Sequence, residues 1–235
     1  MCVIDFHTHI LPNIDDGSRS VSESVAMLDA LAKQSVNTVI ATPHFYANDQ
    51  SVDGFLENRN SSYEALKNNG EYSQNIVLGA EVRYYDGISH LSDLKKLRID
   101  GTRFLLLEMP FTKWTNYEVN EIIDIASRGK VTLVLAHIDR YLPMLNNNLL
   151  MKLLSHGVLF QVNASSFSSL FSSLKIIKLL KNNMVHFIGS DCHNTSDRSP
   201  NISVAANMIN KRLGGGAFEE FIDFSNDLFV QNKIV

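Results

Sequence analysis

The chain opens with Met1-Cys-Val-Ile-Asp-Phe-His-Thr-His-Ile-Leu-Pro-Asn-Ile-Asp-Asp-Gly-Ser-Arg19. A short apolar run ends in His7 and His9, and the loop after it carries two aspartates. Residues two apart in a strand point to the same side, so both imidazoles can be directed at one point. Two neutral imidazoles beside a carboxylate favour a transition-metal ion such as zinc, manganese or iron. Taken alone, the motif is equally compatible with an incidental pair of histidines.

Short apolar runs of the same kind recur along the whole chain. They are rich in Val, Ile, Leu and Phe and show little alternation, which is typical of parallel strands covered on both faces. The predicted strands are residues 2–6, 37–41, 75–82, 103–108, 131–136, 158–162 and 185–189.

Amphipathic segments separate these strands. The first begins at Ser20-Val-Ser-Glu23, which has the pattern of a capping box. This alternation predicts repeated βα units in an α/β protein, arranged as a closed or nearly closed (β/α)7 barrel, with an open doubly wound sheet as the alternative. Gly214-Gly-Gly216 reads as a loop before a closing helix, so residues 1–235 are expected to form one domain. The later predicted helices are residues 54–68, 117–127, 148–155, 172–182, 201–212 and 218–232.

The composition excludes several classes of protein. The 21 Lys and Arg against 25 Asp and Glu give a formal net charge of −4, and no basic block stands out. We therefore expect neither nucleic-acid binding nor a polybasic membrane anchor. Two cysteines are too few for a disulfide framework, and no apolar run is long enough to cross a membrane. These features favour a cytoplasmic protein.

Ionisable side chains stand at the ends of six of the seven predicted strands. In a barrel these ends meet at one face, where catalytic groups lie. So many ionisable groups together would repel one another or be costly to desolvate, and bound cations remove that conflict. Nine ligands are too many for one ion, so two or three ions are expected. The candidate ligands are His7, His9, Asp16, His44, Glu81, Glu108, His137, Asp191 and His193; His90, His156 and His186 lie away from strand ends and are excluded.

Six motifs give the chain a family resemblance. It resembles the polymerase-and-histidinol-phosphatase (PHP) superfamily, and within it the bacterial metal-dependent protein-tyrosine phosphatases of capsular and exopolysaccharide loci. The motifs follow the order of that family from one end of the chain to residue 198. They are His7-Thr-His-Ile-Leu-Pro-x-x-Asp-Asp-Gly17, Ala41-Thr-Pro-His-Phe45, Gly79-Ala-Glu-Val-Arg83, Leu106-Leu-Glu-Met-Pro110, Ala136-His-Ile-Asp-Arg-Tyr141 and Ser190-Asp-Cys-His-Asn194.

The resemblance implies a distorted (β/α)7 barrel with a trinuclear site, usually of manganese, with iron and zinc as alternatives. It implies phosphotyrosine substrates on the tail of a polysaccharide-chain-length tyrosine kinase, with Arg140 and Arg198 on the substrate phosphate. By motif, one ion would be held by His7, His9, Glu81 and Asp191, a second by Glu81, Glu108 and His137, and a third by Asp16, His44 and His193.

This chemistry suits the residues. Paired ions can activate a water and clamp the attacking and leaving oxygens, while a guanidinium fork matches two phosphate oxygens. A surface salt bridge is the alternative role for each arginine. Asp197 or His44 are the candidates for a general acid, which an easily departing phenolate makes dispensable. Asp15 is expected only to shape the turn.

Residues 192–198 also match the motif of a different phosphatase mechanism. Cys192 and Arg198 match Cys-x5-Arg, the loop of cysteine-dependent tyrosine phosphatases. That mechanism needs a thiolate, whereas Asp191 and Asp197 would raise the thiol pKa and repel phosphate. We therefore interpret Cys192 as a packing residue.

Three other functions compete with a phosphotyrosine phosphatase. A small-molecule phosphatase, such as one for histidinol phosphate, would need insertions to build its pocket, and residues 47–55 and 111–117 are the main ones. A non-catalytic metal-binding module would be expected to have lost some of the ligands. A metal-dependent amidohydrolase would usually have a lysine bridging the metals, and no predicted strand ends in one.

Overall fold

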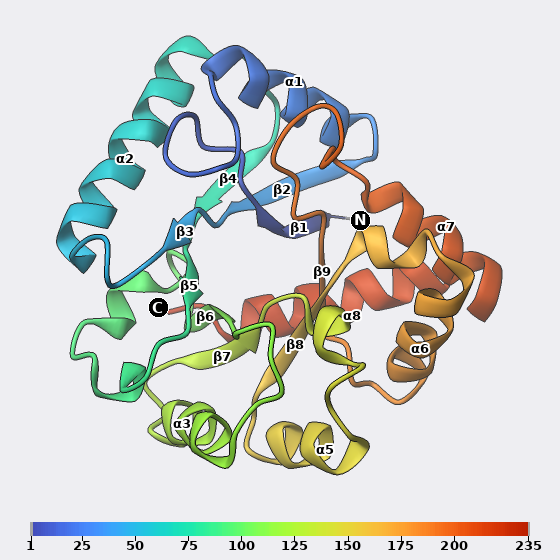
Figure 1. Cartoon of the computed structure of the whole chain (residues 1–235). Coiled ribbons are helices and arrows are strands. Elements are labelled where there is room, and N and C mark those ends of the chain that lie inside the picture. The colour runs from blue at the N-terminus through green and yellow to red at the C-terminus, as the bar shows by residue number, and fades with distance from the viewer. Residues whose placement is uncertain (1, 235) are drawn as a thin grey trace.

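The computed structural model describes residues 2–234, apart from the side chains of residues 170–172. Parallel strands form a ring, and helices surround it (Figure 1). The strands are β1 (Val3–Thr8), β2 (Val36–Ala41), β3 (His44–Phe45), β4 (Asn75–Leu78), β5 (Glu81–Arg83), β6 (Phe104–Glu108), β7 (Thr132–Leu135), β8 (Leu159–Asn163) and β9 (Phe187–Gly189).

Backbone hydrogen bonds join these strands into a closed ring. The two sheets have the orders β1-β2-β4 and β3-β5-β6-β7-β8-β9. The amide of Gly79 donates to the Ala41 carbonyl (2.8 Å), and that of Glu81 to the Pro43 carbonyl (3.0 Å), so pairing continues from β2–β4 into β3–β5. The Asp191 amide donates to the His7 carbonyl (2.8 Å), which links β9 to β1. The nine described strands are therefore seven staves of a barrel, as predicted.

One predicted strand boundary is wrong. Residues 75–82 do not form one strand, because the stave breaks at Gly79 and Ala80 into β4 and β5, and its neighbour breaks at Thr42 and Pro43. Proline has no N–H for the ladder, which favours a break there. The buried guanidinium of Arg59 donates to the Gly79 carbonyl (3.1 Å) and holds the kink from outside the barrel.

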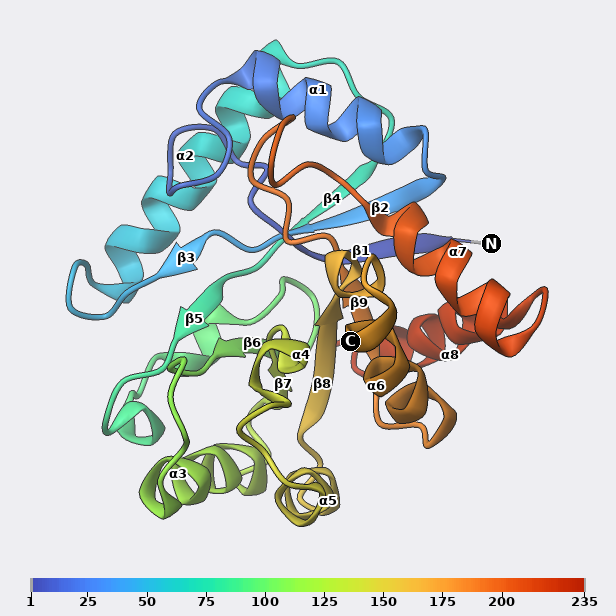
Figure 2. The same cartoon turned by 45° about the vertical axis from the view of Figure 1, so that its right-hand side comes forward.

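The helices match their predicted ranges to within two residues. Those around the barrel are α1 (Val21–Ala32), α2 (Val52–Asn69), α3 (Asn116–Ser127), α5 (Asn147–Ser155), α6 (Leu170–Lys181) and α7 (Ile202–Leu213); α8 (Ala217–Gln231) follows, and the short α4 (Ile138–Tyr141) is unpredicted. Helices α1 and α2 pack together outside β2 and β4, whereas α3 and α5 lie on the far side of the ring (Figure 2). Among the described residues no helix combines the length and apolarity needed to cross a bilayer.

The predicted capping box at the start of α1 is only half formed. The Ser20 hydroxyl accepts from the Glu23 amide (3.1 Å), but the Glu23 carboxylate accepts from the amide of Arg19 (2.8 Å) rather than from that of Ser20. The Ser20 hydroxyl still satisfies one orphan donor of the first turn, and the helix begins where predicted.

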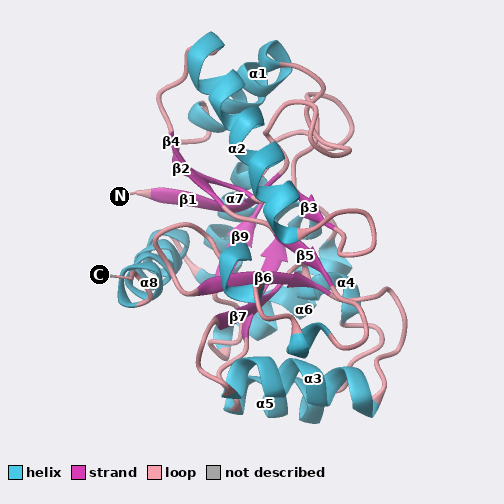
Figure 3. Ribbon diagram, turned by 90° about the vertical axis from the view of Figure 1, so that its left-hand side faces the viewer, coloured by secondary structure: helices cyan, strands magenta, loops and turns pink. Residues whose placement is uncertain are grey.

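Aromatic side chains fill the interior of the barrel below the strand ends. The rings of Phe6 and Phe187 stack with centroids 3.8 Å apart, and Phe104 meets both edge-on. Phe229 of α8 packs against Phe104 (5.9 Å). Figure 3 shows α8 across the end of the ring where β1 begins. That end is therefore sealed by apolar packing, and polar groups are left for the opposite end.

Candidate metal centre

The nine predicted ligands all lie at the carboxyl end of the barrel staves. They reside on β1, β3, β5 and β6 and on the segments that follow β1, β7 and β9. His137 and Asp191 have left-handed backbones, with φ of 32° and 54°. Such strain in non-glycine residues concentrates at functional sites, because only a well-packed surrounding holds it. Seven of the nine side chains are buried, whereas His44 is half-buried and Asp16 is exposed.

Four of these side chains converge on one point. Nε2 of His7 and Nε2 of His9 lie 3.2 Å apart, and Oε2 of Glu81 is 3.1 Å from the first and 3.2 Å from the second. Oδ1 of Asp191 lies 3.5 Å from His9 Nε2. Ligand atoms bound to one ion at about 2.1 Å lie about 3.0–3.5 Å apart, so this spacing fits a shared cation.

The other carboxylate oxygen of Glu81 faces a second group. Oε1 of Glu81 is 2.9 Å from His137 Nε2, and Oε1 of Glu108 is 3.5 Å from the same nitrogen. Glu81 therefore stands between the two groups, in the position of a bridging ligand.

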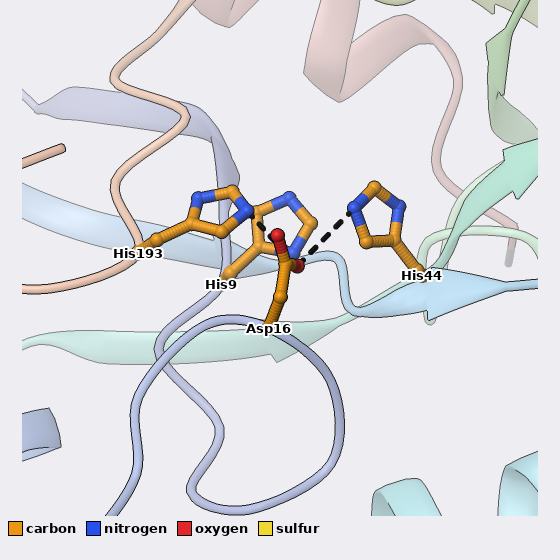
Figure 4. A group of neighbouring side chains, drawn as sticks. All are labelled: His9, Asp16, His44 and His193. Atoms are coloured by element: carbon orange, nitrogen blue, oxygen red, sulfur yellow. Dashed lines mark ion pairs between the residues drawn. The ribbon is translucent and has the colours of Figure 1, made fainter.

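A third group lies nearer the solvent. Figure 4 shows Asp16 between His44 and His193, with His9 behind it. Oδ1 of Asp16 is 3.4 Å from His44 Nε2 and 3.3 Å from His193 Nε2. His44 also turns Nδ1 toward Oε2 of Glu81 (3.0 Å), so this group adjoins the other two.

The outer hydrogen bonds of the imidazoles show that cations fit this site. Nδ1 of His9 faces the Asp15 carboxylate (2.7 Å), Nδ1 of His7 the Gln161 side-chain oxygen (3.3 Å), and Nδ1 of His193 the Asp191 carbonyl (3.0 Å). Because these oxygens only accept, each Nδ1 donates, and in the neutral ring each Nε2 presents a lone pair. The lone pairs point at one another and at carboxylates, which is repulsive unless a positive charge lies between them.

The pKa values show the same demand for positive charge. Burial lowers the pKa of His9, but hydrogen bonds to Asp15 and Glu81 outweigh it and raise the pKa to about 10. Burial likewise lowers the pKa of His137, yet Glu108 and Glu81 raise it to about 9. Burial raises the pKa of Glu81, but the surrounding histidines hold it well below its usual range. Without metal the cluster takes up protons, and a metal ion would replace them.

Both predicted phosphate-binding arginines lie at the rim of this cluster. Nη2 of Arg140 pairs with Oδ2 of Asp191, and Nη2 of Arg198 with Oδ1 of the same carboxylate (3.0 Å). Arg198 also reaches Asp16 (3.5 Å). Each guanidinium is partly exposed, so each can face an anion that enters from solvent. A third arginine, Arg83, is absent from the sequence prediction and pairs with Glu108 (2.7 Å).

The structure adds residues that orient the ligands. Asp15 accepts from the Gly17 amide (2.9 Å), which confirms its predicted role in the turn, but it also holds His9. Gln161 accepts from the His137 amide (2.7 Å), and Asn163 donates to Asp191 Oδ2 (2.8 Å). Gln161 and Asn163 are two residues apart at the end of the apolar strand β8, so their side chains point to the same side, and this spacing could have predicted that both face the cluster.

The cysteine mechanism has no support in the geometry. Cys192 is fully buried, and burial together with the charge of Asp5 raises the pKa of its thiol far above its usual value. Its interpretation as a packing residue is confirmed. Asp197, a candidate general acid, is exposed and accepts from the Ser196 hydroxyl (2.9 Å). Among the described residues, the three excluded histidines belong to none of the clusters.

Fold and site together define a class of protein, a (β/α)7 barrel whose strand ends gather histidines and carboxylates suited to divalent metal ions. The chain belongs to the CpsB/CapC family of capsular polysaccharide synthesis, whose model matches residues 3–231. This assignment confirms the resemblance seen in the sequence motifs.

Known proteins of the family align over most of the chain. CapC of Staphylococcus aureus is 31% identical over 206 residues, covering 83% of this chain and 79% of its own. The tyrosine-protein phosphatase YwqE of Bacillus subtilis is 29% identical over 223 residues, covering 90% and 85%. A crystal structure from work on YwqE and CpsB of Streptococcus pneumoniae, which are metal-dependent tyrosine phosphatases, superposes with a TM-score of 0.82 at 25% identity. It covers 99% of this chain and 96% of that chain.

Proposed function

We propose that this protein is a metal-dependent protein-tyrosine phosphatase, acting as one domain over residues 1–235. The observation that carries the proposal is a buried histidine–carboxylate cluster with two partly exposed arginines at its rim, in a chain of the CpsB/CapC family. A site for a phosphate monoester needs both parts, because cations must neutralise the phosphoryl oxygens while donors orient them.

The proposed site holds two or three divalent ions, with manganese favoured and iron or zinc as alternatives. When bound, these ions supply Lewis acidity toward the phosphoryl group and a nucleophile from water at neutral pH. Asp15 and Gln161 keep the rings of His9 and His7 turned so that their Nε2 lone pairs face inward. The proposed ligands are His7, His9, Glu81 and Asp191 for one ion, Glu81, Glu108 and His137 for the second, and Asp16, His44 and His193 for the third.

The proposed role of Arg140 and Arg198 is to bind the phosphate group of the substrate. Arg140 and Arg198 both reach Asp191, from which each can turn to an entering phosphate. A guanidinium matches two phosphate oxygens at once and stays charged at any pH of interest. These two residues therefore bind and orient the phosphoryl group.

The proposed physiological substrate is a phosphotyrosine segment of a tyrosine kinase that serves polysaccharide export, with the reaction taking place in the cytoplasm. The family's place in capsular polysaccharide synthesis supports this partner. A water nucleophile requires no phosphoenzyme, so the buried Cys192 takes no part.

The test is metal-free protein reconstituted separately with Mn²⁺, Zn²⁺ and Fe²⁺. Each form is assayed on a phosphotyrosine peptide, the matched phosphoserine peptide and histidinol phosphate. We expect the phosphotyrosine peptide to be hydrolysed fastest, and a preference for histidinol phosphate would overturn the proposal.

Arg140→Ala tests the phosphate-binding role. Loss of a charged hydrogen-bond partner should weaken competitive inhibition by inorganic phosphate about 10-fold to 100-fold, while bound metal is unchanged. Arg212→Ala, at an exposed arginine of α7, is the control. Loss of metal from the Arg140→Ala protein would show that Arg140 instead supports the ligands.

A further inference from the structure

Two half-exposed aromatic rings lie against the candidate metal centre. Tyr46 is 38% exposed and Phe111 is 47% exposed, values unusual for large apolar side chains in this protein. The ring of Tyr46 lies beside that of His44, with centroids 5.3 Å apart. The ring of Phe111 stacks on His137, with centroids 5.8 Å apart and planes inclined by 20°. Each ring thus rests on an imidazole of the cluster and leaves other surface to solvent.

The strand order places both rings on one side of the barrel mouth. Tyr46 directly follows β3, and Phe111 follows β6 by three residues, while β5 lies between those strands. Arg83 ends β5, and its guanidinium lies 5.8 Å from the Phe111 ring. We refer to Tyr46 and Phe111 as the aromatic wall.

The other side of the mouth has a different character. The segment after β9 carries Asn194, Ser196, Asp197 and Arg198, which bond to one another or to the cluster. An apolar group that enters with a phosphate therefore meets polar side chains toward this segment and apolar surface toward the aromatic wall.

One ring of the aromatic wall, Phe111, lies close to a proposed phosphate-binding arginine. The guanidinium of Arg140, a proposed phosphate-binding group, lies 5.8 Å from the centroid of Phe111. A phosphoryl group held by Arg140 therefore brings the first atoms of its leaving group beside that ring.

We infer that Tyr46 and Phe111 determine specificity by contacting the phenyl ring of the leaving group, so that aryl phosphate monoesters are selected over alkyl ones. The inference rests on the proposed phosphatase function and names the residues that recognise its substrate class. Aromatic rings attract one another through offset or edge-to-face packing. A phosphoserine carries one methylene between its phosphate oxygen and the backbone, so it offers no ring surface to the wall.

The test separates recognition of the ring from turnover. Metal-loaded wild type, Tyr46→Ala, Phe111→Ala and Phe111→Leu proteins are titrated with phenylphosphonate and methylphosphonate, which share one anionic head and differ in the ring. Phe224→Ala, at a 39% exposed phenylalanine of α8, is the matched control. Hydrolysis of a phosphotyrosine and a phosphoserine peptide is measured on the same proteins.

We expect wild type to bind phenylphosphonate more tightly than methylphosphonate. Each alanine variant should lose roughly tenfold in affinity for phenylphosphonate, with methylphosphonate affinity and metal content unchanged. Phe111→Leu should keep the fold and lose only part of the preference. The ratio of kcat/KM between the two peptides should fall by a similar factor, while Phe224→Ala matches wild type.

Two results would overturn the inference: equal binding of both phosphonates by wild type, or variants whose affinities for both phosphonates fall together. Failure of the proposed function looks different. In that case wild type would prefer phenylphosphonate yet fail to hydrolyse the phosphotyrosine peptide with any metal.

Discussion

Replacing Asp15 with asparagine should weaken metal binding although Asp15 is not among the proposed ligands. Its carboxylate is buried and accepts three hydrogen bonds, from Nδ1 of His9 (2.7 Å), the His44 amide (3.0 Å) and the Gly17 amide (2.9 Å). The bond to His9 fixes the tautomer that turns the Nε2 lone pair inward. An asparagine keeps the shape of the side chain but replaces one acceptor oxygen with a donor.

The magnitude follows from these contacts. Whichever way the amide of Asp15→Asn is turned, its NH₂ group faces either the Gly17 amide or the two donors of His9 and His44, so at least one bond is lost. The negative charge that strengthens the bond to His9 is lost as well. Removing such an outer partner of a metal-binding histidine typically costs 10-fold to 100-fold in metal affinity, or about 1.4–2.7 kcal/mol.

Calorimetric titration of metal-free protein with Mn²⁺ measures this loss directly. Asp49→Asn, at an exposed aspartate of a neighbouring loop, is the matched control and should bind as wild type does. Thermal unfolding of the metal-free proteins reports the contribution of Asp15 to the turn separately. If Asp15→Asn lowers the unfolding temperature but leaves the affinity for Mn²⁺ equal to that of the control, the reasoning about His9 is refuted.

Three further outcomes are expected. Cys192→Ser should keep its activity because the thiol is buried, and a chelator should abolish the activity of both this variant and wild type. A folded but inactive Cys192→Ser protein, together with a wild type that stays active in chelator, would contradict this. Glu121→Gln should lower the free energy of unfolding by about 2–3 kcal/mol, because the buried carboxylate accepts from the Tyr84 hydroxyl (2.6 Å) and from loop donors; urea unfolding against the exposed Glu219→Gln measures it. Burial lowers the pKa of His186 to about 4, so the unfolded state binds more protons between pH 6.5 and pH 4, and stability is lost as the pH falls through that range. At pH 5 the resulting loss of stability is about 2 kcal/mol. Urea unfolding at pH 7.5 and pH 5 should show this loss in wild type and not in His186→Gln; equal losses in both proteins would argue against the role of His186.

The strand ends were predictable because two local rules apply to them. Buried parallel strands are continuous apolar runs, and ionisable residues directly after such runs must meet at one face of a barrel. That reasoning identified His137 and Asp191 without any knowledge of their neighbours. It placed the strands and helices for the same reason, since their patterns depend on residues close in sequence.

The break between β4 and β5 could not be predicted in this way. Residues 75–82 have the apolar character of one strand, and the guanidinium of Arg59, which reaches the Gly79 carbonyl from α2, contacts the stave where it kinks. The kink belongs to tertiary packing because its partner is 20 residues away in the chain.

The sequence by itself determined which side chains gather at the barrel mouth, since strand patterns and the order of motifs depend on local periodicity. Only the tertiary structure showed how they are oriented. The sequence predicts only that Asp15 shapes a turn, whereas in the structure its carboxylate also accepts a hydrogen bond from the ring of His9 and orients it. Tyr46 and Phe111 are 65 positions apart and share one wall only because β3, β5 and β6 are neighbours in the ring. Orientation and adjacency across strands depend on closure of the barrel, which no local pattern encodes.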